Sequence, residues 1–348
     1  MGGEDQLIRK LALVVPSETG PRAVGHSRRA STRLGIGDDA AVIMPGRHAD
    51  LIVTCDAFLA GVHFLVDRHP PDSVGYKSLA RATSDVAAMG ATPRYFLLTL
   101  ALPQNMAGQW LSGFLRGMRR AARQLGLQLI GGDTTRSSSV SIGITVLGEI
   151  APGRAITRFG ARLGDVLYVT GKLGAAKLGL EIVRNCPLSK TESVIRGQNR
   201  LLGQHLYPRI RVKLGEWLAK RGLATSMIDI SDGLSTDLRR ICAASGVGAR
   251  VWAERIPCVE IPARQSSLAR QRKLDPLQMA LHGGDDYELL FTVPRELARR
   301  LQSAPEFRDI TAIGEITRSE QVLLVDANGH ARPLKPCGWD PFRKSDSD

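Results

Sequence analysis

The sequence predicts a mixed α/β protein built from two domains. Short apolar runs of strand length alternate with longer stretches of helical periodicity along most of the chain. Its 348 residues exceed an average single domain, and a hydrophobic content of 43% with 36 glycines suits packed α/β cores. Residues 151–164 are rich in Gly and Arg and lack periodicity, so the predicted domains are 1–150 and 151–340.

The first domain begins with helical periodicity over residues 4–14, followed by a polar, basic loop over 17–33. An apolar strand is expected at 51–55. Apolar side chains at helical spacing predict a helix over 71–89. The remaining elements expected here are strands at 95–102, 127–130 and 139–149 and a helix near 106–125.

The second domain opens with a strand at 165–170, then a glycine-rich turn and helix over 171–184. Two helical stretches fill 192–221, and a strand at 226–230 leads into a helix over 234–244. The later elements expected are strands at 249–253, 287–293 and 321–325 and helices at 276–282 and 294–303. This alternation favours mixed or parallel sheets covered by helices.

The formal net charge of +13 is compatible with nucleic acid, an anionic membrane or a polyphosphate substrate. The basic residues are scattered, and aromatic residues make up only 5% of the chain, which is few for a base-stacking platform. We therefore expect neither a nucleic-acid partner nor a membrane. The five cysteines form no C-x-x-C pair, and no signal-peptide pattern opens the chain. A cytoplasmic location is expected.

Six short segments contain an Asp, in most cases after an apolar run, and in five of them the Asp stands beside Gly, Ser or another Asp. The segments are Gly37–Asp39, Thr54–Asp56, Ser84–Asp85, Gly131–Thr135, Asp229–Gly233 and Gly283–Asp286. Carboxylates are the hard oxygen ligands that Mg²⁺ prefers, and glycine lets backbone amides approach phosphate oxygens. Any one segment alone is better explained as an ordinary turn. Six together, without a Walker motif, favour a site for magnesium-bound polyphosphate.

Other candidate residues are ambiguous from spacing alone. His63 is either a core histidine or a substrate contact. Trp339 either anchors the C-terminal segment or covers an aromatic substrate. Ser231 lacks a histidine in a recognisable partner motif, so a hydrolase triad is not indicated.

The acidic segments, in this order, resemble the thiamine-monophosphate kinase family, which belongs to the superfamily of aminoimidazole ribonucleotide synthetase. The most specific parts are GIGDDAAV at 35–42, TCDAFLAGVHF at 54–64, SLARATSDVAAMGATP at 78–93, LIGGDTTR at 129–136, IDISDGLSTDL at 228–238 and GGDDYELLF at 283–291. The resemblance implies an enzyme that phosphorylates thiamine monophosphate with ATP. It also implies a homodimer formed through the N-terminal domain, with a C-terminal α/β domain completing the active site.

The resemblance also implies roles for single residues. The magnesium ligands would be Asp39, Thr54, Cys55, Asp56, Asp85, Asp133, Asp229 and Asp232, with K⁺ as an optional second cation. ATP would contact Gly132, Asp133, Arg158 and Ser231. The thiamine end would contact His63, Asp285 and Trp339. Asp85, bridging two ions, and Asp133 are the expected catalytic carboxylates.

Three departures from the family pattern stand out. Cys55 replaces a hydroxyl residue, so its backbone carbonyl is the expected oxygen ligand. Asp285 stands where Glu is usual and is one methylene shorter. The basic segment 17–33 is longer than expected. The alternatives are a superfamily member with a different phosphate acceptor and a basic nucleic-acid-binding protein whose acidic turns are structural.

Overall fold

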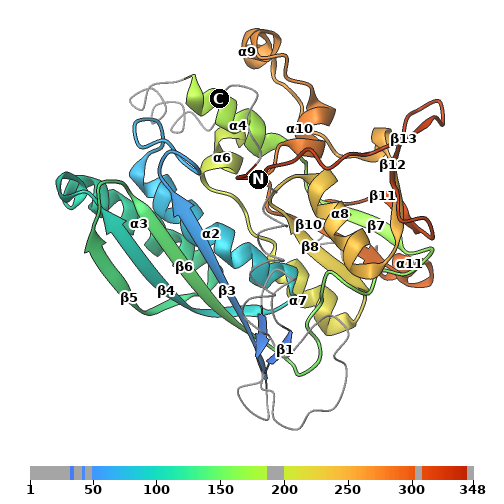
Figure 1. The fold of residues 1–348 in the computed structure, drawn as a ribbon, viewed down its shortest axis with the longest axis horizontal. Helices are drawn as coiled ribbons and strands as arrows, with labels where there is room; N and C mark the ends of the chain where they lie inside the picture. Colours follow the sequence, from blue (N-terminus) through green and yellow to red (C-terminus); the bar gives the residue numbers. More distant parts are fainter. Residues whose placement is uncertain (1–31, 35–40, 44–48, 186–199, 302–307, 343–348) are drawn as a thin grey trace.

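The computed structural model describes residues 32–34, 41–43, 49–185, 200–301 and 308–342. The helix expected at 4–14 and most of the basic loop 17–33 lie outside these residues. Within them, the chain forms two sheets (Figure 1); helices cover one face of the first sheet and both faces of the second.

The first sheet has six strands in the order β1-β2-β3-β6-β4-β5. Their bounds are β1 Thr32–Leu34, β2 Ala41–Ile43, β3 Asp50–Leu59, β4 Thr92–Leu102, β5 Gln128–Arg136 and β6 Ser141–Ile150. Only β4 and β5 run parallel; the other neighbours are antiparallel. Helices α2 (Pro71–Ala88) and α3 (Gln109–Leu125), with the 3₁₀ turn Gln104–Met106, complete this half.

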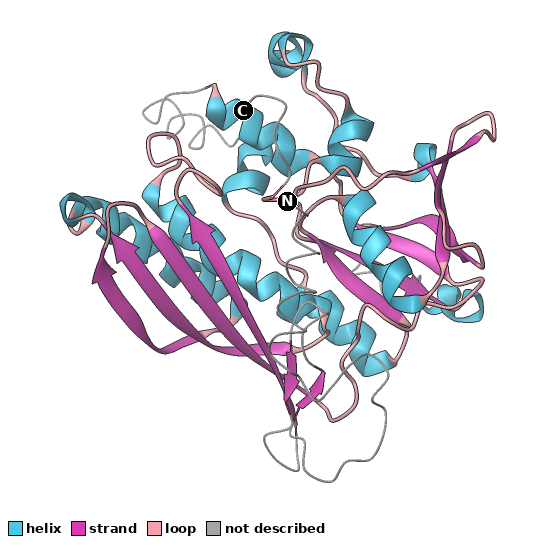
Figure 2. Ribbon diagram, in the orientation of Figure 1, coloured by secondary structure: helices cyan, strands magenta, loops and turns pink. Residues whose placement is uncertain are grey.

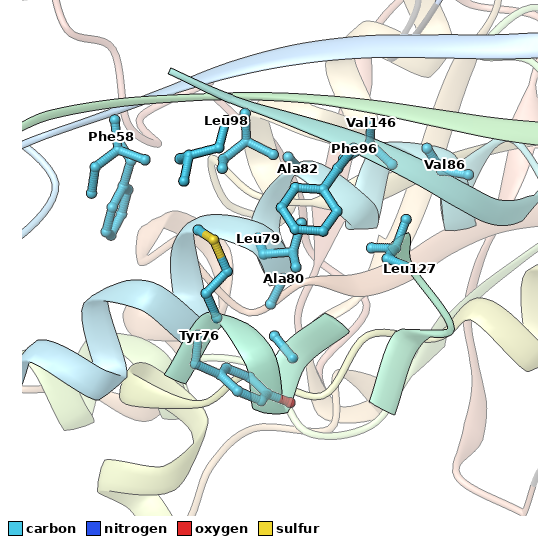
Figure 3. Packing of buried hydrophobic residues seen from close by; sticks show 14 of the residues in the cluster. Phe58, Tyr76, Leu79, Ala80, Ala82, Val86, Phe96, Leu98, Leu127 and Val146 are labelled. Atoms are coloured by element: carbon cyan, nitrogen blue, oxygen red, sulfur yellow. The ribbon is translucent and has the colours of Figure 1, made fainter. Parts of the chain in front are cut away.

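The core of this half lies between the sheet and α2 (Figure 3). Burial alternates along β6 with a period of two, which places one set of side chains against the helices. Figure 3 shows strand side chains meeting helical ones, among them Phe58, Phe96, Leu98 and Val146 facing Leu79, Ala82 and Val86. Burying such apolar surface stabilises the fold by roughly 25 cal/mol per Å².

Helices α2 and α3 pack closely because glycines lie at their contact. A Cβ on Gly75 would come closer than 3.0 Å to the backbone of Phe114, and one on Gly117 would do the same at the backbone of Asp72. No side chain lies between the two backbones at these points. The contact therefore requires glycine for space rather than for backbone conformation.

The second sheet has seven strands in the order β13-β12-β9-β11-β7-β10-β8 and is mixed, with β9 and β12 parallel (Figure 2). The strands are β7 Val166–Thr170, β8 Ser226–Ile230, β9 Gly248–Trp252, β10 Glu288–Val293, β11 Ile310–Thr317, β12 Val322–Val325 and β13 Ala331–Pro333. The α-helices are α4 Ala175–Arg184, α6 Arg200–Leu206, α7 Val212–Arg221, α8 Leu234–Ser245, α9 Ser266–Gln271, α10 Pro276–His282 and α11 Ala298–Leu301. Short 3₁₀ turns span Ala253–Arg255, Ala263–Gln265 and Arg295–Leu297.

Most expected elements are present, and the mixed α/β class is confirmed. Two expectations were wrong in detail. The strand predicted to end near residue 55 continues to Leu59, so Asp56 lies within a strand. Residues 131–135, predicted as an acidic turn, lie within β5. Sequence patterns also missed β11 and α9. Within the described residues, no helix is long and apolar enough to cross a membrane.

Candidate functional site

Helix α2 carries three polar side chains spaced one turn apart: Lys77, Arg81 and Asp85. Residues four apart on an α-helix lie on the same face, so these groups form one row. Asp85 and Arg81 contact strand β3, and Lys77 contacts the second half of the chain. These three side chains therefore connect the parts of the chain that form the candidate site.

Two of these contacts are made with strand β3. The hydroxyl of Thr54 donates to Asp85 Oδ2 at 2.5 Å. Arg81 donates from Nε and Nη2 to the two carboxylate oxygens of Asp56, at 2.8 and 3.3 Å. Thr54 and Asp56 are two residues apart, so both side chains point to the sheet face that carries α2. The structure thus brings two predicted magnesium ligands, Asp56 and Asp85, to neighbouring positions.

The third contact joins the two halves of the chain. Lys77 Nζ donates to Asp285 Oδ2 at 2.7 Å. Asp285 precedes β10, and its backbone amide donates to the carbonyl of Ser231, just after β8, at 2.7 Å. Gly284 has φ of +67°, and a Cβ there would meet the Ser231 carbonyl at 2.6 Å, so this turn requires glycine.

The C-terminal segment is anchored beside the same turn. The backbone amide of Trp339 donates to the carbonyl of Asp232 at 2.9 Å, while the indole remains 46% exposed. Asp232 itself forms an ion pair with Arg240 at 2.6 Å. Three residues predicted from distant motifs, Asp232, Asp285 and Trp339, therefore lie around one turn.

A hydrogen bond from the backbone fixes which ring nitrogen of neutral His63 carries the proton. Its Nδ1 accepts from the backbone amide of Leu59 at 2.9 Å, and its ring stacks on Phe58. Burial, reinforced by the positive charge of Arg81, lowers the pKa of His63 to about 4. The ring is therefore neutral at pH 7, and its proton lies on Nε2. His63 presents an N–H donor and does not serve as a base.

Burial and neighbouring charges shift the pKa values of Asp285 and Asp232. Burial alone would raise the pKa of Asp285, but the positive charges of Lys77 and Arg81 hold it well below its usual range. Burial raises the pKa of Asp232, and the negative charge of Asp285 adds to this, while Arg240 opposes it. Acidic groups gathered in this way favour the binding of cations.

The Gly132–Asp133 motif of strand β5 lies apart from these residues. Asp133 is aligned across the sheet with Thr99 and Ala57, whose side chains are exposed, whereas Asp56 is aligned with buried Ile144. Asp133 therefore points away from α2, and three strand spacings separate it from β3, about 14 Å. The structure does not bring Asp133 to Asp56 and Asp85 within one chain.

The other predicted residues are distributed as follows. Asp229 is buried within β8, opposite Leu289 of β10. Cys55 points to the same sheet face as Asp133, and its Sγ accepts from Thr145. Gly132 lies beside Asp133 with φ of +151°. Arg158 lies in the loop after β6, where its carbonyl accepts from Ser245. Asp39 lies outside the described residues.

Among the described residues, no three His, Cys, Asp or Glu side chains converge closely enough to enclose a metal ion. Mg²⁺ is usually held by one or two carboxylates together with waters and substrate phosphates, not by an all-protein cage. The neighbouring oxygens of Thr54 and Asp85, with Asp56 on the same strand face, are donors of the kind Mg²⁺ prefers. The donor set therefore fits this ion.

Three residues of the cluster were not singled out by the sequence: Lys77, Arg81 and Tyr287. Tyr287 donates its hydroxyl to Asp285 Oδ1 at 2.7 Å. The helical spacing of 77, 81 and 85 would have identified the first two, because residues four apart lie on the same helix face as the predicted ligand Asp85. Tyr287 follows directly on the GGDD motif.

The two halves of the chain match two protein-family models. Residues 37–150 match AIR synthase related protein, N-terminal domain, and residues 162–326 match AIR synthase related protein, C-terminal domain. The thiamine-monophosphate kinase of Escherichia coli (strain K12) is 38% identical over 322 residues, covering 91% of this chain and 94% of that protein. The Aquifex aeolicus thiamine-monophosphate kinase is 32% identical over 309 residues, covering 88% and 92%.

Solved structures show the same similarity across both sheets. A structure described as AaThiL complexed with AMPPCP and TMP has a TM-score of 0.77 and 29% identity, covering 98% of this chain and 97% of that chain. The thiamine-monophosphate kinase from Stenotrophomonas maltophilia K279a has a TM-score of 0.70 and 34% identity, covering 94% and 96%.

Proposed function

The chain belongs to the thiamine-monophosphate kinase family, and from that premise we propose that it transfers the γ-phosphoryl group of ATP to thiamine monophosphate, forming thiamine diphosphate and ADP. The observation that carries this proposal is the polar row on α2. Its Asp85 end meets the oxygens of β3, and its Lys77 end meets Asp285 of the second half. One helix thus connects a site for phosphates with a site for the acceptor.

Magnesium would be held chiefly by Asp85 and Asp56, with Thr54, the Cys55 carbonyl, Asp229, Asp232 and Asp39 as further oxygen donors. When bound, Mg²⁺ neutralises the charge of the transferred phosphoryl group. Carboxylates from β3, α2 and β8 are suited to this task because they come from three rigid elements. Arg158, Gly132 and Ser231 are assigned to the nucleotide.

The acceptor needs little activation by the protein. Its phosphate is already an anionic nucleophile at neutral pH, so no strong general base is required. Rate enhancement then comes from holding the two phosphates in line and from charge complementarity. The Nε2–H of His63, the carboxylate of Asp285 and the indole of Trp339 are assigned to orienting the thiamine end. We place the enzyme in the cytoplasm, where its free cysteines stay reduced.

A homodimer would explain the position of Asp133. The face of the first sheet opposite α2 exposes the large apolar side chains of Tyr95 and Leu97, which are 39% and 36% exposed, and the adjoining β5 exposes Leu129 and Ile130 at 50% and 51%. Exposed apolar side chains gathered on one sheet face indicate an interface. A second copy on this face would bring its β5 motif, with Gly132 and Asp133, toward β3 of the first. Asp133 would then serve the site of the other subunit.

Mixing two inactive variants tests this arrangement. If Asp85 and Asp133 serve the same site from different subunits, a heterodimer of Asp85→Asn and Asp133→Asn has one intact site and one doubly altered site. Randomly exchanged dimers should then recover about a quarter of wild-type kcat. The control is each variant mixed with itself, which should stay inactive. Mixtures without recovery, despite subunit exchange shown by mass, would place Asp133 in its own chain's site.

Product analysis tests the proposed function itself. The protein is incubated with ATP, Mg²⁺ and, separately, thiamine monophosphate, unphosphorylated thiamine and a panel of phosphorylated vitamins and nucleotides. Thiamine diphosphate and ADP should form in equal amounts with thiamine monophosphate, and thiamine should give no product. Turnover of a different phosphorylated acceptor, with thiamine monophosphate inert, would assign the chain to another reaction of the superfamily.

A further inference from the structure

A buried chain of polar side chains runs from Asp285 into the protein. Lys77 Nζ, which donates to Asp285, also lies 3.3 Å from Nδ1 of His205 in α6. His205 Nε2 lies 3.0 Å from Nε2 of His69. Lys77, His205 and His69 are only 1–2% exposed. Buried polar groups of this kind are tolerated only when they are hydrogen-bonded, so each link constrains the next.

A charged Lys77 assigns the donors and acceptors along this chain. The ammonium of Lys77 has no acceptor capacity, so Nδ1 of His205 must accept from it. The proton of neutral His205 then lies on Nε2 and is donated to His69 Nε2. His69 in turn carries its proton on Nδ1 and donates it to the carbonyl of Leu65 at 3.2 Å, so the backbone amide of Leu65, 3.1 Å from the same nitrogen, cannot donate to it. The chain therefore ends on the loop after β3, which also carries His63.

Asp285 is held firmly although its side chain is only partly buried. Oδ2 accepts from Lys77, and Oδ1 accepts from the buried hydroxyl of Tyr287. The backbone is left-handed at both residues, with φ of +62° at Asp285 and +51° at Tyr287. Such conformations are uncommon outside glycine and persist only where surrounding contacts enforce them. The Asp285 side chain is nevertheless 34% exposed, so its remaining lone pairs are open to a ligand.

We propose that Lys77 and His205 are positioning residues for the acceptor substrate, fixing the direction and charge of Asp285 and linking it to the loop that carries His63. This inference rests on the proposed function. Neither residue touches the substrate in this scheme. Lys77 acts through Asp285, and His205 acts by filling the one acceptor position that keeps Lys77 directed at that carboxylate.

The Lys77→Met variant tests the first role. Methionine is unbranched and apolar, so it fills the buried space without leaving an unpaired charge. Asp285 would keep only its bond from Tyr287, and we expect KM for thiamine monophosphate to rise at least about tenfold, with KM for ATP within about twofold. An unchanged KM for thiamine monophosphate in the folded variant would overturn the proposal.

Tyr207→Phe is the matched control. Tyr207 follows α6 and donates to Asp72 of α2 at 2.8 Å, so its loss weakens the contact between the same two elements. Its hydroxyl takes no part in the chain from Asp285 to His69. This variant should lose stability and keep both KM values. A rise in KM for thiamine monophosphate equal to that of Lys77→Met would show that loosening α2 and α6 is sufficient, which also overturns the proposal.

A pair of variants at His205 tests the second role. In His205→Asn, the amide oxygen can replace Nδ1 as acceptor from Lys77, so KM for thiamine monophosphate should stay close to wild type. In His205→Leu that acceptor is absent, and the same KM should rise at least about tenfold. Equal KM values for the two variants would remove His205 from a positioning role.

Imidazole nitrogen shifts in the substrate-free protein give a readout that does not depend on turnover. His205 should be protonated on Nε2 and His69 on Nδ1, and this pattern should be lost in Lys77→Met. The opposite tautomers in the wild-type protein would contradict the proposed chain of hydrogen bonds. If the expected tautomers were found but thiamine monophosphate were not a substrate, the proposed function would fail while the buried network would stand.

Discussion

Replacing Asp85 with Asn is expected to lower kcat/KM for thiamine monophosphate at least ~100-fold, about 2.7 kcal/mol of transition-state stabilisation. Asparagine preserves an oxygen that can accept from the Thr54 hydroxyl, so the local hydrogen bond survives. What is lost is the negative charge at the end of the α2 row. Because catalysis is assigned to cation-assisted phosphoryl transfer, that charge should matter more than any other single group.

Steady-state kinetics at several magnesium concentrations would measure this effect. Asp67→Asn provides the control, since Asp67 is 74% exposed beside Arg68 and loses the same charge outside the site. The control should stay within about twofold of wild type. Near-wild-type turnover of Asp85→Asn would remove Asp85 from the centre of the mechanism.

The second large effect is expected on stability, from Gly117→Ala in α3. Alanine usually stabilises a helix interior by about 1 kcal/mol relative to glycine. Here the added Cβ would overlap the backbone of Asp72 in α2, and neither backbone can move without separating the helices. Overpacking of this kind costs about 1–3 kcal/mol and sometimes more. We therefore expect a net loss of roughly 2 kcal/mol in the free energy of unfolding.

Gly203→Ala in α6 is the matched control, because a Cβ on Gly203 meets no atom within 4 Å. The same substitution should there be neutral or stabilising by up to about 1 kcal/mol. Denaturant unfolding should show a lower free energy of unfolding than wild type for Gly117→Ala and an equal or higher one for Gly203→Ala. A Gly117→Ala variant as stable as wild type would contradict the close contact of α2 and α3.

The main elements could be predicted because their periodicities are clear. The helix over residues 71–89 and the strand at 226–230 appear almost at the predicted bounds as α2 and β8. The turn containing Asp285 was also placed correctly before a strand. Short elements such as α9 carry too few residues for a periodic signal.

The weaker prediction concerned how the motifs sit in the fold. The segment Gly131–Thr135 was predicted as a turn because Gly and Asp favour turns, but pairing with β4 holds these residues in a strand. Residue order along the chain also could not reveal that Asp56 and Asp133 lie on opposite faces of one sheet. That relation depends on the strand order β3-β6-β4-β5, which is a tertiary property.

Lys77 and Arg81 illustrate a different limit. Lys77 lies beside and Arg81 within the motif at 78–93, but the predicted site contained only the carboxylates of that region. In the structure these cations pair with Asp285 and Asp56 and set the charge of the site. A search for charged residues at helical spacing from each predicted ligand would have found them.

The most direct test of the central claim follows the phosphoryl group itself. The protein is incubated with ATP labelled in the γ-phosphoryl group, Mg²⁺ and thiamine monophosphate, and the products are separated. The label should appear in the terminal phosphoryl group of thiamine diphosphate, in amounts equal to the ADP formed. Label released only as inorganic phosphate, or retained in ATP while the protein is folded and magnesium is present, would contradict direct transfer to thiamine monophosphate.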